Sequence, residues 1–473
     1  MSTVLNPGLN PVMDSGCMRA TELIQKGRFA CACGRDHGAN VKEVIIGRDA
    51  LSALPGVLGR LGAARAYIVS DRNTERAAGG RVAAILDAAG FRLDRFVFDR
   101  GFVEPDEPAV GAAVLNMCGG PASEDPLAAG KTAVVAVGSG VINDICKILA
   151  HMTGAPFVTV ATAPSMDGFC SSTSSVLRGG LKVSVGSRCP DAVVGDTEIL
   201  CAAPENSILA GLGDMIAKYV ALFEWKLGHI VTGEYYCELT ANLMREALEK
   251  VVSNAAGLKN REPEAIEAVM EGLVISGIAM DYAGISRPAS GIEHYFSHIW
   301  DMRGVSFGTP VALHGIQCGI GTVLALEGYE KLFAQIAKMN GSKPDYERAR
   351  RAHEVFDVHE HAKKIAARLG PGGEIIAEDL KNRRLYDRAD TEERLRKIAA
   401  NYELIKAEAE KTLPSARLVA EMLRDAGAPV RPSEIGLPDE EIPVDFVMTR
   451  DIRDKYILSS FAYDLGINID FDI

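Results

Sequence analysis

The stretch TAVVAVGSGVINDICK, residues 132–147, decides the fold of this chain. Its first six residues, 132–137, are almost all apolar, as expected of a strand whose two faces are both covered by helices. Gly138, Ser139 and Gly140 follow, and a helical pattern then begins. A strand, a glycine turn and a helix in succession indicate a parallel α/β sheet. Such a turn also lets backbone N–H groups approach a nucleotide pyrophosphate.

The same alternation continues on both sides of this stretch. Short β-branched runs alternate with helical patterns, for example residues 81–89 and 143–152. We therefore predict a parallel sheet in the first 200 or so residues. Its expected strands are residues 44–46, 66–70, 95–98, 132–137, 157–161 and 192–195.

The pattern changes near Pro204, where long apolar-periodic helices replace the short strands. The more charged remainder of the chain is still helical in pattern. We therefore expect an α/β nucleotide-binding domain over residues 1–203 and a mostly helical, metal-binding domain over residues 204–473. The first long helices are expected at residues 206–227, 233–256, 262–284 and 309–337.

Length and composition fit an enzyme of two or three domains. The 473 residues have a formal net charge of −12, which argues against nucleic acid or an anionic membrane as partner. A small basic pocket for a phosphorylated metabolite remains compatible with that charge. Residues 1–16 show no secretory signal, and no apolar run is long enough to span a membrane. The ten scattered cysteines fit reduced thiols, so we expect a cytoplasmic protein.

A polar loop strengthens the nucleotide hypothesis. In VTVATAPSMDGFCSST, residues 158–173, hydroxyls and a carboxylate gather just after a predicted strand, where open α/β folds bind ligands. Asn143 and Asp144 lie in the first turn of the helix that follows the glycine turn. Either segment could also be an ordinary structural turn. The polar side chains of the loop are Thr162, Ser165, Asp167, Ser171 and Ser172.

Asp71 bears on the choice of nucleotide. It follows the predicted strand at residues 66–70, where a carboxylate accepts from ribose hydroxyls and repels the 2′-phosphate of NADP. The positive charge of Arg72, the next residue, weakens this argument against NADP. The balance favours NAD, and NADP stays open.

Three side chains in the middle third form a candidate metal site: Asp214 in GLGDMIAKY, His294 in SGIEHYFSHIW and His314 in TPVALHGIQCG. One carboxylate and two imidazoles are typical ligands of a catalytic divalent ion that keeps a position open for substrate. Each histidine alone is more often a packed or surface histidine than a metal ligand. Asp214 lies in an apolar helical segment and needs a partner there. Lys218, four residues on, offers an ion pair as the alternative.

The surroundings of the two histidines carry further predictions. His298 lies four residues after His294, so both project from one helical face. Residues 310–313, just before His314, have a strand-like pattern.

Two other groups of potential ligands are less complete. Cys31, Cys33 and His37 in CACGRDH form a partial zinc set with no fourth ligand apparent, so we expect a loop with small buried thiols. His353, His359 and His361 lie in a charged helical stretch, where we expect them to be solvated.

Five runs, taken in order, resemble the sn-glycerol-1-phosphate dehydrogenases, in particular the bacterial branch. That family lies within the superfamily of iron-containing alcohol dehydrogenases and dehydroquinate synthases. The resemblance extends from about residue 33 to beyond residue 460, and TAPSMDG and GIEHYFSH are its specific parts. The runs are GSGVINDICK (138–147), TAPSMDGFCSS (162–172), AGLGDMIAKY (210–219), SGIEHYFSHIW (290–300) and LHG (313–315).

The resemblance implies a dehydroquinate synthase-like fold. In such a fold a Rossmann-like α/β domain precedes an all-α domain, and the active site lies between them. It assigns the metal to Asp214, His294 and His314, with zinc as first choice and nickel or iron as alternatives. Asp167, Asp214 and His298 would be the catalytic, substrate-contacting residues. With Asp71 and Asp144 added from the sequence pattern, the NAD or NADP contacts are Gly138, Ser139, Gly140, Val141, Ile142, Thr162, Ser165 and Ser171.

The implied reaction is the reversible reduction of dihydroxyacetone phosphate to sn-glycerol 1-phosphate by NADH or NADPH. A dehydroquinate-synthase-like lyase and a metal-dependent polyol or alcohol dehydrogenase are the alternatives on the same scaffold. A non-catalytic relative would be expected to lack one of the three ligands, and all three residues are present. The expected partner is a phosphorylated triose, and a homodimer is the expected assembly.

Overall fold

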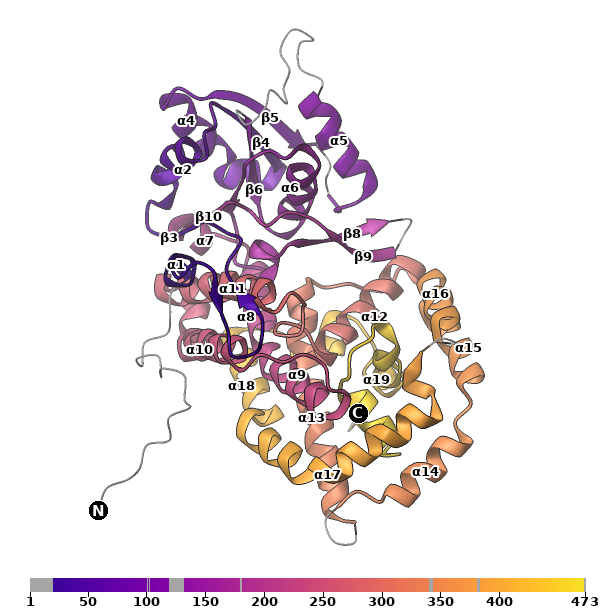
Figure 1. Ribbon diagram of the computed structural model, residues 1–473. Coiled ribbons are helices and arrows are strands. Elements are labelled where there is room, and N and C mark those ends of the chain that lie inside the picture. Colours follow the sequence, from indigo (N-terminus) through magenta and orange to yellow (C-terminus); the bar gives the residue numbers. More distant parts are fainter. Residues whose placement is uncertain are drawn as a thin grey trace, which may run out of the picture.

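The computed structural model describes residues 20–99, 101, 103–118, 132–178, 181–339, 343–380 and 383–471. A sheet flanked by helices forms one end of the molecule, and a larger body of helices forms the other (Figure 1). The expectation about a secretory signal concerned residues 1–16, which lie outside the described residues. Among the helices described, none is long and apolar enough to cross a membrane.

Six parallel strands make up the main sheet, in the order β3-β10-β7-β6-β4-β5. All six predicted strands are confirmed, with ends that agree within three residues. They are β3 (Glu43–Gly47), β4 (Arg65–Asp71), β5 (Arg92–Phe98), β6 (Thr132–Gly138), β7 (Phe157–Ala161) and β10 (Ala192–Asp196).

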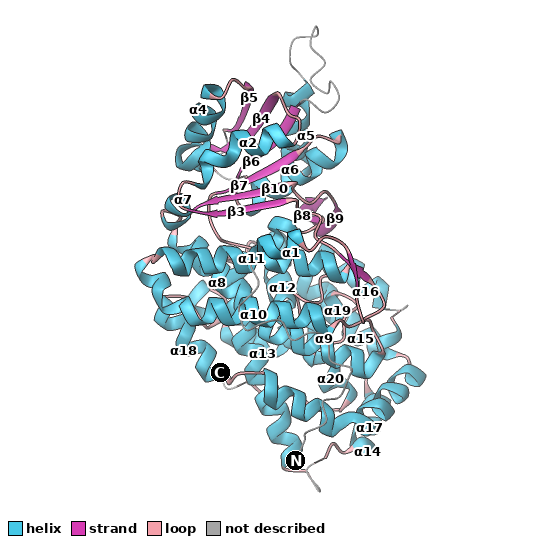
Figure 2. Cartoon of the chain, turned by 60° about the vertical axis from the view of Figure 1, so that its left-hand side comes forward, coloured by secondary structure: helices cyan, strands magenta, loops and turns pink. Residues whose placement is uncertain are grey.

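Helices cover both faces of this sheet, which explains why β6 is buried along its whole length and almost entirely apolar (Figure 2). Val135 and Val137 belong to the apolar core on one face, together with residues of α2 and α4. Val134 and Ala136 alternate with them and belong to the core on the other face, with residues of α5 and α6. The helices are α2 (Leu54–Arg60), α3 (Arg72–Thr74), α4 (Gly80–Ala88), α5 (Glu107–Cys118) and α6 (Gly140–Thr153).

After the sheet, every regular element among the described residues is helical. These helices share one large apolar core. They are α7 (Thr197–Cys201), α8 (Glu205–Ile216), α9 (Lys218–Thr232), α10 (Glu238–Asn254), α11 (Pro263–Ala283), α12 (Ile292–Phe307), α13 (His314–Ala337), α14 (Tyr346–Val355), α15 (Val358–Leu369), α16 (Pro371–Asp379), α17 (Arg388–Thr412), α18 (Ala416–Ala426), α19 (Ile442–Ile452) and α20 (Leu458–Asp464).

The first described segment packs on this helical half. Helix α1 (Ala20–Gln25) and the short strands β1 (Phe29–Ala30) and β2 (Asp36–His37) precede the sheet in sequence. Leu23 and Val41 nevertheless belong to the helical core, and the hairpin lies against the helical half in Figure 1. The domain boundary at residues 203 and 204 stays a prediction.

Three local predictions were wrong. The single helix expected at 206–227 is two helices, α8 and α9, separated at Ala217. Its apolar periodicity continues through the break, so the pattern could not reveal it. Residues 310–313 form no strand, and α13 begins at His314. His361 is buried, with Nε2 2.7 Å from Asp451 Oδ2, so the expectation of a solvated side chain fails there.

An antiparallel hairpin follows the polar loop and was not predicted. It consists of β8 (Thr173–Arg178) and β9 (Leu181–Gly186) and lies outside the main sheet. Ser175, Leu177 and Lys182 of this hairpin line a large cavity between the sheet and the helices.

Candidate active site

A cavity of about 1440 Å³ lies between the sheet and the helical half. The glycine turn and polar loop line one side, and α12 and α13 line the other. Most of the predicted site residues therefore share a single space. Those that line it are Asp71, Ser139, Gly140, Val141, Ile142, Asp144, Ser165, Asp167, Ser171, His294, His298 and His314.

The glycine turn presents the start of α6 to this cavity. Gly140, Val141 and Ile142 are its first three residues, and N–H groups in the first turn of a helix have no intrahelical partner. The positive end of the helix dipole lies at the same place. These N–H groups can therefore donate hydrogen bonds to a phosphate of a dinucleotide.

Gly138 and Thr162 do not line the cavity. Instead, Thr162 donates its backbone N–H to the Gly138 carbonyl at 3.2 Å, which ties the turn to the polar loop. A Cβ on Gly138 would lie 2.6 Å from Ile142 Cβ, so this position requires glycine. Both residues therefore support the conformation of the turn without facing the cavity.

Lys147 holds the polar loop in place and was missed in the sequence. Its side chain is fully buried, and Nζ donates to Ser171 Oγ at 2.9 Å and to the Thr173 carbonyl at 3.0 Å. A third bond reaches the Gly168 carbonyl. Lys147 lies one helical turn after Asn143 in the quoted motif. That spacing could have indicated that both side chains face the polar loop.

The two carboxylates assigned to the nucleotide differ in their surroundings. Asp71 Oδ1 caps α3, accepting from the N–H groups of Asn73 at 2.7 Å and Thr74 at 2.9 Å. That capping orients the carboxylate at the cavity wall. Burial raises the pKa of Asp144 to about 6, and the Lys147 ammonium limits the rise.

The three predicted metal ligands come from three different helices. Asp214 lies on α8, His294 on α12 and His314 at the first position of α13. His294 Nε2 is 3.6 Å from Asp214 Oδ1, and the rings of His294 and His314 are 5.0 Å apart between centroids. The structure thus places His294 beside both of the other predicted ligands.

Glycines allow α8 and α13 to cross closely enough for this. A Cβ on Gly213 would lie 2.1 Å from the Gly315 carbonyl oxygen, and one on Gly315 would lie 1.9 Å from the Ala210 carbonyl oxygen. Each glycine is the sequence neighbour of a predicted ligand, Asp214 or His314. Any larger residue would push the ligands apart.

The donor set fits a divalent cation. His294 Nδ1 lies 2.9 Å from Glu293 Oε1, so Nδ1 carries the proton and the Nε2 lone pair faces the Asp214 carboxylate. Two acceptors 3.6 Å apart inside a protein need a cation or a proton between them. His314 Nδ1 lies 2.8 Å from Ser297 Oγ, and this contact orients the second imidazole.

The Cys318 thiol also belongs to this neighbourhood. Cys318 Sγ lies 3.6 Å from His314 Nε2, and ligand atoms of His294, His314 and Cys318 all lie within 4.8 Å of one another. Burial raises the pKa of Cys318 well above its usual value. A bound metal ion would deprotonate a coordinating thiol, so Cys318 is a further potential ligand at this position.

Asp167, Asp214 and Lys218 form a buried ionic group. Lys218 Nζ donates to Asp167 Oδ2 at 2.6 Å and to Asp214 Oδ1 at 3.0 Å. Burial would raise the pKa of Asp167, but the Lys218 ammonium outweighs it and holds that pKa below its usual value. Burial and the charge of Asp167 raise the pKa of Asp214. The Lys218–Asp214 ion pair, considered as the alternative to a metal-ligand role for Asp214, is therefore present. The same carboxylate also lies beside His294.

His298 faces the cavity next to the candidate metal site. Its ring stacks at 6.0 Å on the ring of His314. Burial lowers the pKa of His298 well below its usual value, and the cations Arg453 and Lys182 act in the same direction. The imidazole is therefore neutral at physiological pH and can accept a proton.

Three basic residues line the cavity and were missed in the sequence. Lys182 pairs with Asp301 at 2.5 Å, and Lys455 Nζ donates to Ser286 Oγ at 3.0 Å and to the Ser290 carbonyl at 2.9 Å. Arg453 is the third, and it is exposed. They come from β9 and from the segment between α19 and α20, so nothing in the sequence connected them. All three act electrostatically on His298, so they bring positive charge to that part of the cavity.

Comparison with known proteins places the chain in a family. Residues 45–204 match the family described as iron-containing alcohol dehydrogenase. A glycerol-1-phosphate dehydrogenase [NAD(P)+] of Bacillus licheniformis is 33% identical over 313 residues, which are 65% of this chain and 76% of the relative. The enzyme of the same name from Methanosarcina acetivorans is 36% identical over 286 residues, 60% of this chain and 76% of the relative. This chain belongs to the glycerol-1-phosphate dehydrogenase family.

Solved structures support the fold of this family member. A probable glycerol dehydrogenase from Sinorhizobium meliloti aligns with a TM-score of 0.56 at 18% identity, covering 91% of this chain and 96% of that one. The maleylacetate reductase of Rhizobium sp. strain MTP-10005 aligns with a TM-score of 0.56 at 16% identity, covering 90% and 94%. The predicted fold class, a Rossmann-like α/β domain followed by a helical domain, is confirmed.

Proposed function

We propose that this protein reduces dihydroxyacetone phosphate reversibly to sn-glycerol 1-phosphate, with NADH or NADPH and one divalent metal ion. One observation supports this above all others. A single cavity is lined by a dinucleotide-type glycine turn, by three basic side chains and by His294 and His314, and the buried Asp214 carboxylate lies against His294. The relatives named glycerol-1-phosphate dehydrogenase [NAD(P)+] support the same reading of the cavity.

The cofactor assignments follow from the chemistry of the donors. Asp214, His294 and His314 would hold the metal, and one carboxylate with two imidazoles suits zinc, nickel or iron, of which zinc is our first choice. The start of α6 and the loop with Ser165 would hold the dinucleotide. The Asp71 carboxylate at the cavity wall favours NAD over NADP.

When bound, the metal ion supplies Lewis-acid stabilisation of negative charge on the substrate oxygen, and the nicotinamide supplies the hydride. The protein's own residues orient the triose and manage its protons. His298 is neutral and faces the cavity, so it can hold a substrate hydroxyl or relay the proton that the oxygen gains on reduction. Asp167, held ionised by Lys218, would position a substrate hydroxyl.

The basic residues would bind the phosphate. Arg453 and Lys455 lie two residues apart in the segment before α20, and Lys182 approaches from the β8–β9 hairpin. In a chain with a net charge of −12, this local cluster gives the cavity a preference for an anionic substrate. A dehydrogenase for unphosphorylated polyols has no need of it.

The organisation of the enzyme completes the proposal. We propose that the nucleotide-binding domain spans residues 1–203 and the metal-binding domain residues 204–473, with the described segment before β3 packed on the metal-binding domain. We also propose a homodimer that acts in the cytoplasm. Size measurement in solution tests the assembly, and cell fractionation tests the location.

A substrate comparison tests the activity. The purified protein should oxidise NADH or NADPH with dihydroxyacetone phosphate and use unphosphorylated dihydroxyacetone far less well. Chelation should abolish turnover, and zinc or nickel should restore it. Equal use of both substrates would support a polyol dehydrogenase. A lyase of the dehydroquinate synthase type would show no net NADH consumption, and full activity after complete metal removal would contradict the proposed mechanism.

A further inference from the structure

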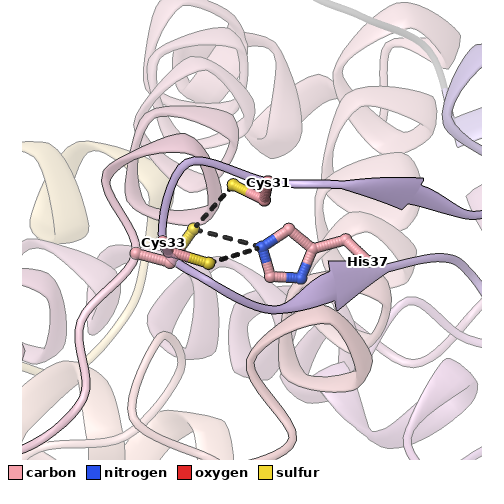
Figure 3. A group of neighbouring side chains, drawn as sticks. Cys31, Cys33 and His37 are labelled. Atoms are coloured by element: carbon pink, nitrogen blue, oxygen red, sulfur yellow. Dashed lines mark hydrogen bonds between the residues drawn. The ribbon is translucent and has the colours of Figure 1, made fainter.

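The fourth ligand missing from the CACGRDH motif is supplied by a distant segment. Cys31 and Cys33 lie on the loop between β1 and β2, and His37 is the last residue of β2 (Figure 3). Cys237, the residue before α10, lies 200 residues after His37 in sequence, and its Sγ is 3.3 Å from His37 Nε2. Four ligand atoms, three sulfurs and one nitrogen, all lie within 4.8 Å of one another.

The distances among these atoms match a tetrahedral zinc ion. With Zn–S near 2.3 Å and Zn–N near 2.0–2.1 Å, tetrahedral geometry separates two sulfurs by about 3.8 Å and a sulfur from a nitrogen by about 3.5 Å. Cys31 Sγ and Cys237 Sγ are 3.8 Å apart. Cys33 Sγ is 3.3 Å from His37 Nε2, as is Cys237 Sγ. The two sulfurs are also too far apart for a disulfide, which needs about 2 Å.

The groups around the cluster prepare it for a cation. His37 Nδ1 lies 2.8 Å from the Tyr282 carbonyl oxygen, so Nδ1 donates and the Nε2 lone pair is turned to the sulfurs. The Tyr235 hydroxyl lies 3.2 Å from Cys33 Sγ and can donate to a thiolate there. The Arg35 guanidinium lies 3.4 Å above the Tyr235 ring and interacts electrostatically with His37, so a positive charge lies near the net negative charge that three thiolates and one Zn²⁺ would have.

We propose that Cys31, Cys33, His37 and Cys237 form a structural zinc site, separate from the catalytic metal. Four protein ligands fill a tetrahedral zinc completely and leave no position for substrate. None of the four lines the large cavity. Cys237 and His37 are buried, while Cys31 and Cys33 are partly exposed at the loop.

The site explains how a very short hairpin stays on the helical half. Strands β1 and β2 have two residues each, and a hairpin of that size has little stability of its own. The ion would join its loop to the start of α10, and the His37 ring stacks on Tyr282 at the end of α11. The zinc ion would therefore supply stability that so short a pair of strands cannot provide.

Metal counting with matched variants tests the proposal. The wild-type chain should bind two equivalents of metal. Cys237→Ser should lose one equivalent and keep the catalytic one, whereas His294→Ala should do the reverse. Cys118→Ser, at an exposed cysteine outside the cluster, should keep both. His37→Cys should retain the second ion, because four thiolates also bind zinc.

A spectroscopic test uses the wild-type protein and does not depend on the folding of any variant. Loaded with Co²⁺, the protein should show sulfur-to-cobalt charge-transfer absorption of the intensity expected for three thiolates, whereas Cys318 could contribute one thiolate at most at the Asp-His-His site. A thiol-binding mercurial should then release one metal equivalent. Absence of that absorption, a second equivalent that survives Cys237→Ser, or a Cys31–Cys237 disulfide in the native protein would each overturn the proposal.

Discussion

Three imidazoles in this chain are held in the same manner. Each binds an oxygen through Nδ1 and turns Nε2 toward a candidate metal position. The oxygen belongs to Glu293 for His294, to Ser297 for His314 and to Tyr282 for His37. Such partners fix the orientation of a ligand before any ion binds, which reduces the ordering cost of metal binding.

Glu293 should therefore contribute to catalysis without touching substrate. Glu293→Gln keeps the shape of the side chain and removes the negative charge beside His294. We expect metal affinity to fall about 10–100-fold, with activity restored at high metal concentration. Metal titration of the depleted enzyme measures this. Glu421→Gln, on a surface ion pair of α18, is the control and should change nothing. Loss of activity that excess metal does not restore would contradict the positioning role.

Loss of the Lys455 proton should weaken binding of the phosphorylated substrate at high pH. Burial lowers the pKa of Lys455 to about 7, and Arg287 and Arg453 act in the same direction. The ammonium is therefore present below pH 7 and lost above it. The substrate phosphate gains its second charge above a pKa of about 6. For the phosphorylated substrate, kcat/KM should thus be highest between about pH 6 and 7 and fall about tenfold per unit above that.

Two comparisons isolate this lysine. Lys455→Arg keeps the charge at high pH and should remove the alkaline fall. Unphosphorylated dihydroxyacetone should show no such fall with the wild-type enzyme. Steady-state kinetics across pH 5.5–9 measures both, with that range chosen to bracket the two titrations. An alkaline fall that persists in Lys455→Arg would assign it to another group.

At the scale of elements, the candidate metal site depends on one helix crossing. Asp214 and His314 reach the same space because α8 and α13 meet glycine against glycine. The residues Gly213 and Gly315 were visible in the sequence. Their contact was not, because a glycine within a helix does not reveal which partner it faces.

Gly213→Ala should damage the site from outside it. The new Cβ would lie 2.1 Å from the Gly315 carbonyl oxygen, so one helix has to move. Overpacking of this kind costs about 1–3 kcal/mol of unfolding free energy, and displaced ligands should weaken metal binding. Chemical denaturation and metal titration measure the two effects. Gly111→Ala on α5, where the Cβ has open space, should be neutral or stabilising. Wild-type behaviour of Gly213→Ala would refute the argument.

At the scale of the whole molecule, the sequence predicted the sheet better than the site. The inner strands of a parallel sheet are marked by continuous apolar runs, as in β6, and the edge strand β5 by the short run at its end, so all six were found. Residues such as Cys237, Lys182 and Lys455 act through long-range contacts and carry no local signal. The resemblance to a known family supplied the role of His298, which spacing alone could not.

The two halves that face the cavity contribute different parts of the proposed site. All three proposed metal ligands come from the helical half, whereas the glycine turn belongs to the sheet half. Metal-free protein should therefore still bind NADH, with an affinity within about twofold of the loaded enzyme, because no proposed metal ligand is among the proposed dinucleotide contacts. Turnover should be lost all the same. Fluorescence titration of NADH with the chelated enzyme and with His294→Ala measures this independence. If both preparations fail to bind NADH, the two halves are coupled through the metal, and the cavity forms only when the ion is present.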